Sequence, residues 1–206
     1  TADSGELPLT LAKGEWCVVE LPAIAVGFIR MSVRAEEQSD LIVALSENPK
    51  GTFELGKFNM QTTVEYKLSP GGVYDLETFE VYGFKKIAVF SLSGKVTLGS
   101  VGYRPYERDT SGIVKREFRH KRLSAVYDAA VRSFAHNSVD IYMDCPTRER
   151  AGWLCDSYFS AKAESFLYAD SVIEDVFLEN YLLYKNDGVV PRGILPMCYP
   201  SDYGKD

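Results

Sequence analysis

The chain has 206 residues, of which 46% are hydrophobic and 25% are charged, a globular composition that excludes the disordered class. Its net charge of -6 disfavours binding to nucleic acid or to an anionic membrane surface. No apolar run approaches the roughly 20 residues that cross a bilayer, so we predict no membrane span. The opening "TADSGELPLT" also lacks the basic start and apolar stretch of a signal peptide.

The first half of the chain is predicted to form strands. Seven segments between residues 15 and 106 are short, rich in β-branched and aromatic residues, and separated by Pro, Gly and Asn. They are 16–22, 26–36, 40–47, 62–69, 76–83, 85–94 and 96–105. In "FIRMSVRAE" we expect Phe28, Met31 and Val33 to face inward, with a bulge between Phe28 and Met31. Strands of this number and length predict a jelly-roll-like β-sandwich over residues 1–112.

The hydrophobic period becomes helical after "RPYERDTSG", and we assign residues 113–206 to a helical segment. Helices are predicted over 120–138, 157–169 and 172–185, the last capped by Asp170 or Ser171. Their broad apolar faces lack a fourth helix to cover them, which indicates an incomplete helical domain that can associate with itself. The faces carry Leu123, Val126, Phe134, Phe159, Phe166, Val176, Leu178 and Leu182. The acidic residues at helical spacing are predicted to be solvated, and these are Glu164, Glu174, Asp175 and Glu179.

Few residues of the chain suit metal, cofactor or nucleophile chemistry. The four cysteines form no CxxC pair, and His120 and His136 are the two histidines, so we predict no metal site. Neither a GxGxxG loop nor a phosphate-binding loop is present, so we predict no cofactor. Any catalysis by this chain would depend on carboxylates.

One stretch, "DCPTRERAGWLCD" from residue 144 to residue 156, concentrates charge around Pro and Trp without a helical or strand period. Pro146 interrupts the helical pattern, and a compact turn there would bring Asp144, Glu149 and Asp156 toward one pocket beside Trp153. Mutual repulsion and the apolar ring both favour a protonated carboxyl group. Glycoside cleavage needs such an acid to protonate the leaving oxygen.

The same residues also have purely structural interpretations. Asp144 and Asp156 lie beside predicted helix ends, where Asp is a common cap. Arg148 and Glu149 can form a surface ion pair of little energetic value. Trp153 can be an ordinary core residue. The residue pattern by itself leaves both interpretations open.

The stretch resembles a motif of the bacterial α-L-rhamnosidases of glycoside hydrolase family 78. That motif usually reads Asp-Cys-Pro, Arg, Glu-Arg, Gly-Trp, Gly-Asp. The flanking "YDAAVRSFAHNSVDIYMDCP" and "DGVVPRGILP" are similar to the first helices and following loop of that family's (α/α)6 barrel. The strand-rich half resembles the sandwich that precedes the barrel. One departure is Cys155, where the family commonly has Gly, and its larger side chain would narrow the pocket.

The resemblance implies an inverting hydrolase that cleaves terminal α-L-rhamnose from a glycan or glycoside, with Glu149 as general acid. It implies that Asp144 and Asp156 hold sugar hydroxyls, that Trp153 walls the C6 methyl region, and that Arg148 lies in or behind the pocket. The glutamate base of the family lies much later in the barrel. We therefore expect the chain to be a piece of a longer enzyme and inactive alone. Enzymes of this type are often exported, so both an exported and a cytoplasmic location in a bacterium stay open.

Two rival functions stay open. The chain can be a carbohydrate-binding or structural β-sandwich module with helices as an attachment, or a glycosidase or lyase for another sugar. In the module, a row of exposed tyrosines would stack on sugar rings. The candidates are Tyr66, Tyr74, Tyr82, Tyr103 and Tyr106. Solved geometry separates these functions, because a module needs exposed aromatics and a hydrolase needs carboxylates beside Trp153.

Overall fold

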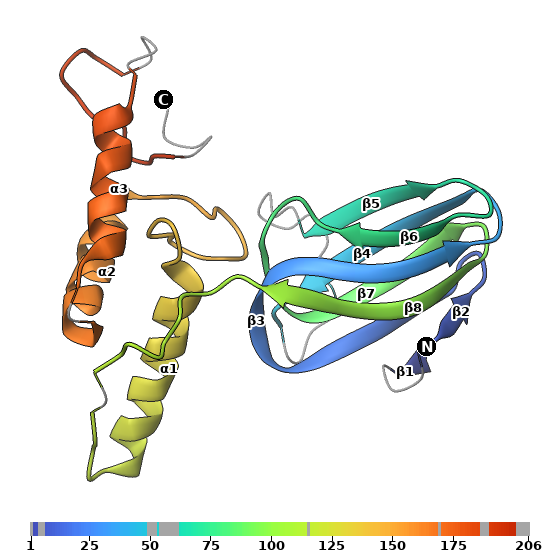
Figure 1. Ribbon diagram of the computed structural model, residues 1–206, viewed down its shortest axis with the longest axis horizontal. Helices are drawn as coiled ribbons and strands as arrows, with labels where there is room; N and C mark the ends of the chain where they lie inside the picture. Colours follow the sequence, from blue (N-terminus) through green and yellow to red (C-terminus); the bar gives the residue numbers. More distant parts are fainter. Residues whose placement is uncertain are drawn as a thin grey trace. The chain divides into compact units, whose positions relative to one another are not determined.

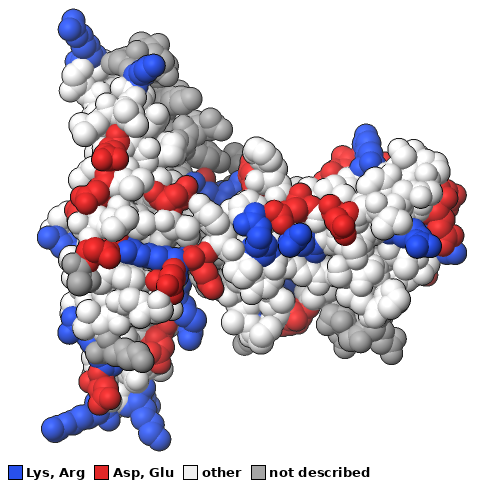
Figure 2. Space-filling view, in the orientation of Figure 1, with Lys and Arg blue, Asp and Glu red and all other residues white. Residues whose placement is uncertain are grey.

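The computed structural model describes residues 2–3, 7–48, 53, 62–114, 116–168, 170–185 and 190–200. The chain divides into two compact units, a sheet unit over Thr1–Tyr106 and a helical unit over Glu107–Asp206. Figure 1 shows strands in the first unit and helices in the second. Figure 2 shows acidic and basic side chains next to one another on the visible face of each unit.

The described strands of the sheet unit form one hydrogen-bonded sheet. Strands β2 to β8 pair in an antiparallel manner in the order β2-β8-β3-β7-β4-β5, with β6 also paired to β3, while β1 lies parallel to β3. Their bounds are β1 Ala2–Asp3, β2 Leu9–Leu11, β3 Trp16–Ala35, β4 Ser39–Ser46, β5 Thr63–Leu68, β6 Val73–Glu77, β7 Tyr82–Ser93 and β8 Val96–Pro105. The prediction of antiparallel strands followed by helices is thus confirmed.

Strand β3 joins two segments that the sequence predicts as separate strands. Its first part pairs with β7, and its second part pairs with β8 and β6. The register against β7 shifts between Glu20 and Ala25, around Pro22. Because proline has no N–H to donate, it interrupts the ladder without ending the strand. The predicted strand break is therefore a local irregularity inside one long strand.

The inward face of β3 differs from the prediction at one position. Ile29, Met31 and Val33 are buried in strict alternation, and Phe28 is half-buried on the opposite face. There the Arg104 guanidinium lies 4.0 Å from the Phe28 ring centroid, and Tyr106 meets the ring edge-on. The inward assignment of Phe28 was wrong, and so was the predicted bulge. The register against β8 shifts between Ser32 and Val33 instead.

The predicted strand 76–83 is wrong, because a turn separates β6 from β7 within it. The Thr78 hydroxyl accepts the Ile29 N–H at 3.0 Å and donates to the Glu80 carbonyl at 2.9 Å. This buried side chain takes the place of a backbone ladder contact. Phe79 follows it and is 98% exposed. Residues 78–81, although their composition is typical of a strand, therefore form the connection between β6 and β7.

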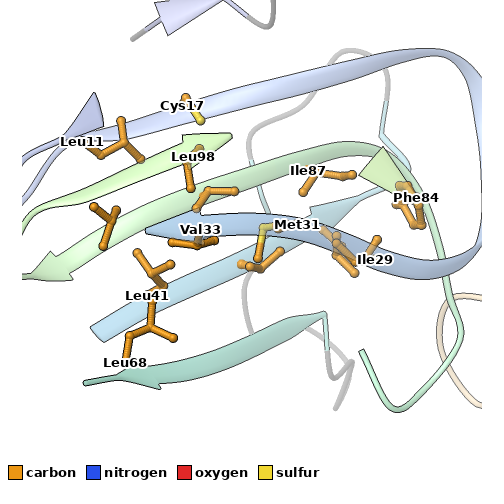
Figure 3. Packing of buried hydrophobic residues seen from close by; sticks show 14 of the residues in the cluster. Leu11, Cys17, Ile29, Met31, Val33, Leu41, Leu68, Phe84, Ile87 and Leu98 are labelled. Atoms are coloured by element: carbon orange, nitrogen blue, oxygen red, sulfur yellow. The ribbon is translucent and has the colours of Figure 1, made fainter. Parts of the chain in front are cut away.

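One hydrophobic core holds the sheet unit together. Figure 3 shows Met31, Val33, Leu41 and Leu98 gathered between the strands. The cluster draws buried side chains from β2, β3, β4, β5, β7 and β8, so the sheet folds around a shared interior. The jelly-roll-like sandwich stays a prediction.

The helical unit contains three helices in its described part, α1 Lys121–Asn137, α2 Leu154–Leu167 and α3 Val172–Leu183. His120 caps α1, because its Nδ1 accepts the Arg122 N–H at 3.3 Å. Ser171 is the N-cap residue of α3, as predicted, and its side chain makes no capping bond. Within the described residues, no helix has the length and apolar character to cross a membrane.

The core of the helical unit is mainly aromatic. It comprises Phe134, Ile141, Tyr142, Leu167, Tyr168, Ile173, Phe177 and Tyr181. Of the apolar residues predicted on the helix faces, Phe134 is buried. The others are 40–84% exposed, namely Leu123, Val126, Phe159, Phe166, Val176, Leu178 and Leu182. The start of an (α/α)6 barrel remains a prediction that these uncovered faces fit.

Candidate active site

Between α1 and α2 the chain forms a loop that Asp144 closes at its base. The Asp144 N–H donates to the Ala151 carbonyl at 3.1 Å, and the Ala151 N–H donates to Asp144 Oδ1 at 3.0 Å. The Cys145 thiol donates to Asp144 Oδ2 at 3.0 Å. The two ends of the loop are thereby tied together through one half-buried carboxylate.

The backbone of this loop is tightly constrained near its end. Arg150 adopts φ 51°, in the left-handed region that non-glycine residues seldom occupy. Gly152 is buried, and a Cβ atom added there would lie 2.6 Å from the Tyr199 carbonyl oxygen. These constraints determine where the side chains of Glu149 and Trp153 emerge.

Glu149 is the predicted site residue with the most direct contacts. Its Oε2 accepts the indole Nε1–H of Trp153 at 2.7 Å, and its Oε1 lies 2.9 Å from Nη2 of Arg148. The Glu149 side chain is 22% exposed and that of Arg148 is 48% exposed. Arg148, Glu149 and Trp153 therefore form a connected group whose carboxylate is still reachable from solvent.

Asp156 lies apart from that group in its bonding. It is the third residue of α2, where its charge interacts favourably with the helix dipole, and its side chain is exposed. Among the described residues, no hydrogen bond or ion pair joins Asp156 to Asp144 or Glu149. Convergence of all three carboxylates on one pocket thus stays a prediction. Cys155, beside Asp156, is exposed.

A second segment, Met197–Tyr199, holds the end of the loop in place. The Leu154 N–H donates to the Met197 carbonyl at 2.9 Å, and the Tyr199 N–H donates to the Gly152 carbonyl at 3.0 Å. Trp153 and Cys198 form an isolated antiparallel bridge between these bonds. Sequence reasoning gave this segment no role. The Gly152–Trp153 pair was the available signal, since a buried glycine often marks close backbone approach.

Tyr181 of α3 adds a further bond to the same place. Its hydroxyl donates to the Gly152 carbonyl at 2.9 Å. Burial raises the pKa of Tyr181 to about 12, so the hydroxyl keeps its proton well above neutral pH. The loop end is thus bonded to both α3 and the segment Met197–Tyr199.

Glu164 was predicted to be solvated, and the structure shows that this was wrong. Its carboxylate is fully buried and interacts with the Arg108 guanidinium, the Tyr142 hydroxyl, and the N–H groups of Ile173 and Glu174. Burial, followed by the hydrogen bond to Glu164, raises the pKa of Tyr142. Helical spacing alone could not reveal these partners, because they come from three separate stretches of the chain.

A pocket of about 310 Å³ is lined by residues of α2 and α3 together with Tyr142. Its described lining includes Tyr142, Leu154, Tyr158, Lys162 and Phe177, and none of the five predicted site residues. The described residues also contain no group of three or more His, Cys, Asp or Glu side chains arranged to hold a metal ion.

Comparison with known proteins links this helical unit to one enzyme family. Residues 117–205 match the model of the bacterial alpha-L-rhamnosidase 6 hairpin glycosidase domain. That range contains the loop, α1 to α3 and the segment Met197–Tyr199. No curated protein sequence matches the chain.

Solved structures of low sequence identity share the fold. A family 78 rhamnosidase of Bacillus sp. GL1 aligns with a TM-score of 0.76 and 16% identity, covering 90% of this chain and 19% of its own. A Klebsiella oxytoca rhamnosidase with rhamnose bound gives 0.70 and 14%, covering 84% and 37%. An Aspergillus terreus α-L-rhamnosidase gives 0.65 and 21%, covering 96% and 23%.

The chain therefore spans less than two fifths of each of these three structures. By sequence over residues 117–205 and by fold over most of its length, it resembles the bacterial α-L-rhamnosidases of glycoside hydrolase family 78.

Proposed function

We propose that this chain supplies the general acid and part of the sugar pocket of an inverting glycoside hydrolase that removes terminal α-L-rhamnose. The observation that carries the proposal is the group formed by Arg148, Glu149 and Trp153, which lies within the stretch that matches the family model. The rhamnose bound to the Klebsiella oxytoca relative supports rhamnose as the sugar.

In the proposed reaction, Glu149 gives its carboxyl proton to the glycosidic oxygen while the bond from C1 to that oxygen breaks. Water attacks C1 from the opposite face and loses a proton to a second carboxylate. The products are rhamnose and the free alcohol, and solvent exchange returns the proton to Glu149. Inversion requires the two carboxyl groups to lie roughly 6.5–9.5 Å apart, with water between them.

The second carboxylate is proposed to come from a part of the enzyme outside these 206 residues. The 206-residue chain is accordingly expected to bind no productive water and to show no turnover by itself. This expectation follows from the chemistry, because protonation of the leaving oxygen without delivery of water does not complete hydrolysis.

The remaining predicted residues are proposed to shape the sugar pocket. Each oxygen of Asp144 accepts one bond within the loop, which leaves acceptor capacity for sugar hydroxyls on the same carboxylate. Asp156 is exposed on the adjoining turn of α2 and offers a further acceptor. The Trp153 ring supplies an apolar wall, and Arg148 lies at the solvent side of the pocket.

The geometry of the sheet unit argues against the rival function of a carbohydrate-binding module. Of the five candidate tyrosines, Tyr82 is buried and the other four are half-buried. Tyr103 packs edge-on against Phe84, and the Tyr74 hydroxyl bonds to Ser69. Among the described residues these tyrosines are packing residues, and they form no exposed row for sugar stacking.

The test is Glu149→Gln in the complete enzyme, assayed with rhamnosides of different leaving groups. The amide keeps the shape of the side chain and cannot donate an acidic proton. We expect a loss of about 10²–10⁴-fold in kcat on poor leaving groups, and a clearly smaller loss on activated aryl rhamnosides, which need less protonation.

Glu179→Gln is the matched control, because Glu179 is an exposed glutamate on α3. It should leave both rates unchanged. If Glu149→Gln reduces both substrate types equally, the assignment of Glu149 as the general acid is wrong.

A further inference from the structure

Among the described residues, the side chains of Arg148 and Trp153 donate to Glu149, and they differ in how firmly they are held. The Arg148 side chain is 48% exposed, so water competes with its ion pair. The Trp153 indole is half-buried and reaches Oε2 at 2.7 Å. A tryptophan side chain has two torsions, so little conformational freedom is lost when it is fixed. Trp153 is therefore the more firmly held of the two donors to Glu149.

The backbone on both sides of Trp153 is fixed from outside the loop. Gly152 is bonded to Tyr199 and to the buried Tyr181 hydroxyl, and Leu154 is bonded to Met197. Trp153 itself forms the bridge to Cys198 between these bonds. Its indole is thus carried by a backbone with partners in two other stretches of the chain, α3 and Met197–Tyr199, a rigid base of the kind that precise catalytic geometry requires.

The identity of the two donors determines where a proton on Glu149 can reside. The indole N–H can only donate, and a carbonyl oxygen accepts a hydrogen bond better than the hydroxyl oxygen of a carboxyl group does. Oε2, which accepts the indole N–H, is therefore the carbonyl oxygen of the protonated side chain. The proton is thereby directed to Oε1. Arg148 faces that atom, and protonation of Oε1 removes the negative charge that holds the exposed guanidinium there.

We propose that Trp153 is a positioning residue for the general acid, in addition to its ring forming a wall. Its indole N–H holds Oε2, the acidic proton resides on Oε1, and Arg148 leaves Oε1 as the glycosidic oxygen takes its place. The catalytic part of this inference rests on the proposed function. The hydrogen bond from Trp153 to Glu149 can be tested without an activity assay.

The first experiment measures that hydrogen bond directly. The chain has two tryptophans, Trp16 and Trp153, so its indole N–H region in a ¹H–¹⁵N spectrum contains two resonances, which Trp16→Phe assigns. Glu149→Ala should move the Trp153 indole resonance strongly upfield, because the charged acceptor is lost. Glu179→Ala should leave it in place. An unmoved resonance in Glu149→Ala overturns the inference, whatever the enzyme is found to hydrolyse.

The second experiment measures catalysis in the complete enzyme with Trp153→Phe, which keeps an aromatic wall and removes the N–H. We expect kcat on poor leaving groups to fall by about 10²-fold, as for a misplaced catalytic group, with KM nearly unchanged and a smaller loss on activated aryl rhamnosides. In the double variant Trp153→Phe with Glu149→Gln, the rates should depend on the leaving group no more strongly than they do in Glu149→Gln alone. Trp16→Phe, in the sheet unit, is the control.

If the Trp153 ring serves only as an apolar wall of the sugar pocket, the expected result is different. Trp153→Phe would then raise KM and reduce the rates on both leaving groups equally, and this outcome overturns the inference even where Glu149→Gln behaves as an acid variant should. If Glu149→Gln itself shows no dependence on the leaving group, the proposed function fails. The indole resonance then still reports whether Trp153 bonds to Glu149.

Discussion

Gly152 shows how a single residue without a side chain supports the candidate site. An added Cβ would lie 2.6 Å from the Tyr199 carbonyl oxygen and 3.0 Å from Cε2 of Phe177. The first of these atoms belongs to the backbone and the second to a ring that is 1% exposed, so neither can move aside easily. The absence of a Cβ atom at Gly152 therefore allows the two backbones to approach and the bond between Gly152 and Tyr199 to form.

We predict that Gly152→Ala separates the loop from the segment Met197–Tyr199. Overpacking of this kind costs about 1–3 kcal/mol, so the free energy of unfolding of the helical unit should fall by that amount in chemical denaturation. Gly112→Ala is the control, since its Cβ would meet the Tyr168 ring at an ordinary 3.8 Å. Equal stability of the two variants would contradict the close approach described here.

At this scale the sequence indicated which residues gather in the loop and could not indicate how they bond. Asp144, Glu149 and Trp153 are near neighbours along the chain, so their proximity follows from a compact turn around Pro146. The bond from the Trp153 indole to Glu149 also depends on Met197–Tyr199, which is remote in sequence. A glycine such as Gly152 can signal close backbone approach, but the local pattern does not identify the segment that approaches.

At the scale of elements, Glu164 connects four parts of the helical unit. From α2 it reaches the Arg108 guanidinium before α1, the Tyr142 hydroxyl after α1, and the first N–H groups of α3. The positive end of the α3 dipole and the guanidinium both favour its negative charge. The helical spacing of apolar residues predicted all three helices. It did not predict the burial of Glu164, because spacing shows which side of a helix a residue lies on and does not show what that residue contacts.

Replacement of Glu164 by Gln should destabilise the helical unit severely. It keeps the shape of the side chain but leaves Arg108, whose side chain is 12% exposed, without a buried counter-charge. Breaking a buried pair in this way typically costs about 3–5 kcal/mol, to be measured as the loss in unfolding free energy in urea. Glu179→Gln, an exposed substitution on α3, should change it by less than about 0.5 kcal/mol. Similar unfolding midpoints for the two variants would refute the role given to Glu164.

At the scale of the whole molecule, the two units differ in how completely they bury their apolar residues. The sheet unit surrounds one core, whereas α1 to α3 expose Val126, Phe159 and Leu182 by 66%, 68% and 84%. These uncovered faces could be predicted, because apolar residues at helical spacing are a local property. The long shared strand β3 could not, because the path of a strand past Pro22 depends on which strands pair beside it.

The uncovered faces should make the 206-residue chain associate with itself in a concentration-dependent manner. Large exposed apolar patches are costly, at about 25 cal/mol per Å² of apolar surface. Sedimentation should show that Phe159→Glu with Leu182→Glu weakens the association, while Phe79→Glu, at an exposed turn of the sheet unit, does not. Amide hydrogen exchange should also be faster after Arg119 than within the sheet unit. A chain that stays monomeric at all concentrations would contradict this prediction.

The bridge between Trp153 and Cys198 also has a consequence for biosynthesis. A ribosome releases the chain from the N-terminus, so Glu149 and Trp153 emerge while Met197–Tyr199 has not yet been translated. The loop can adopt its final conformation only after α2 and α3 have formed and brought that segment back to Gly152. The candidate acid is therefore assembled late, and a substitution that slows this return lowers the yield of competent molecules without changing the chemistry of those that mature.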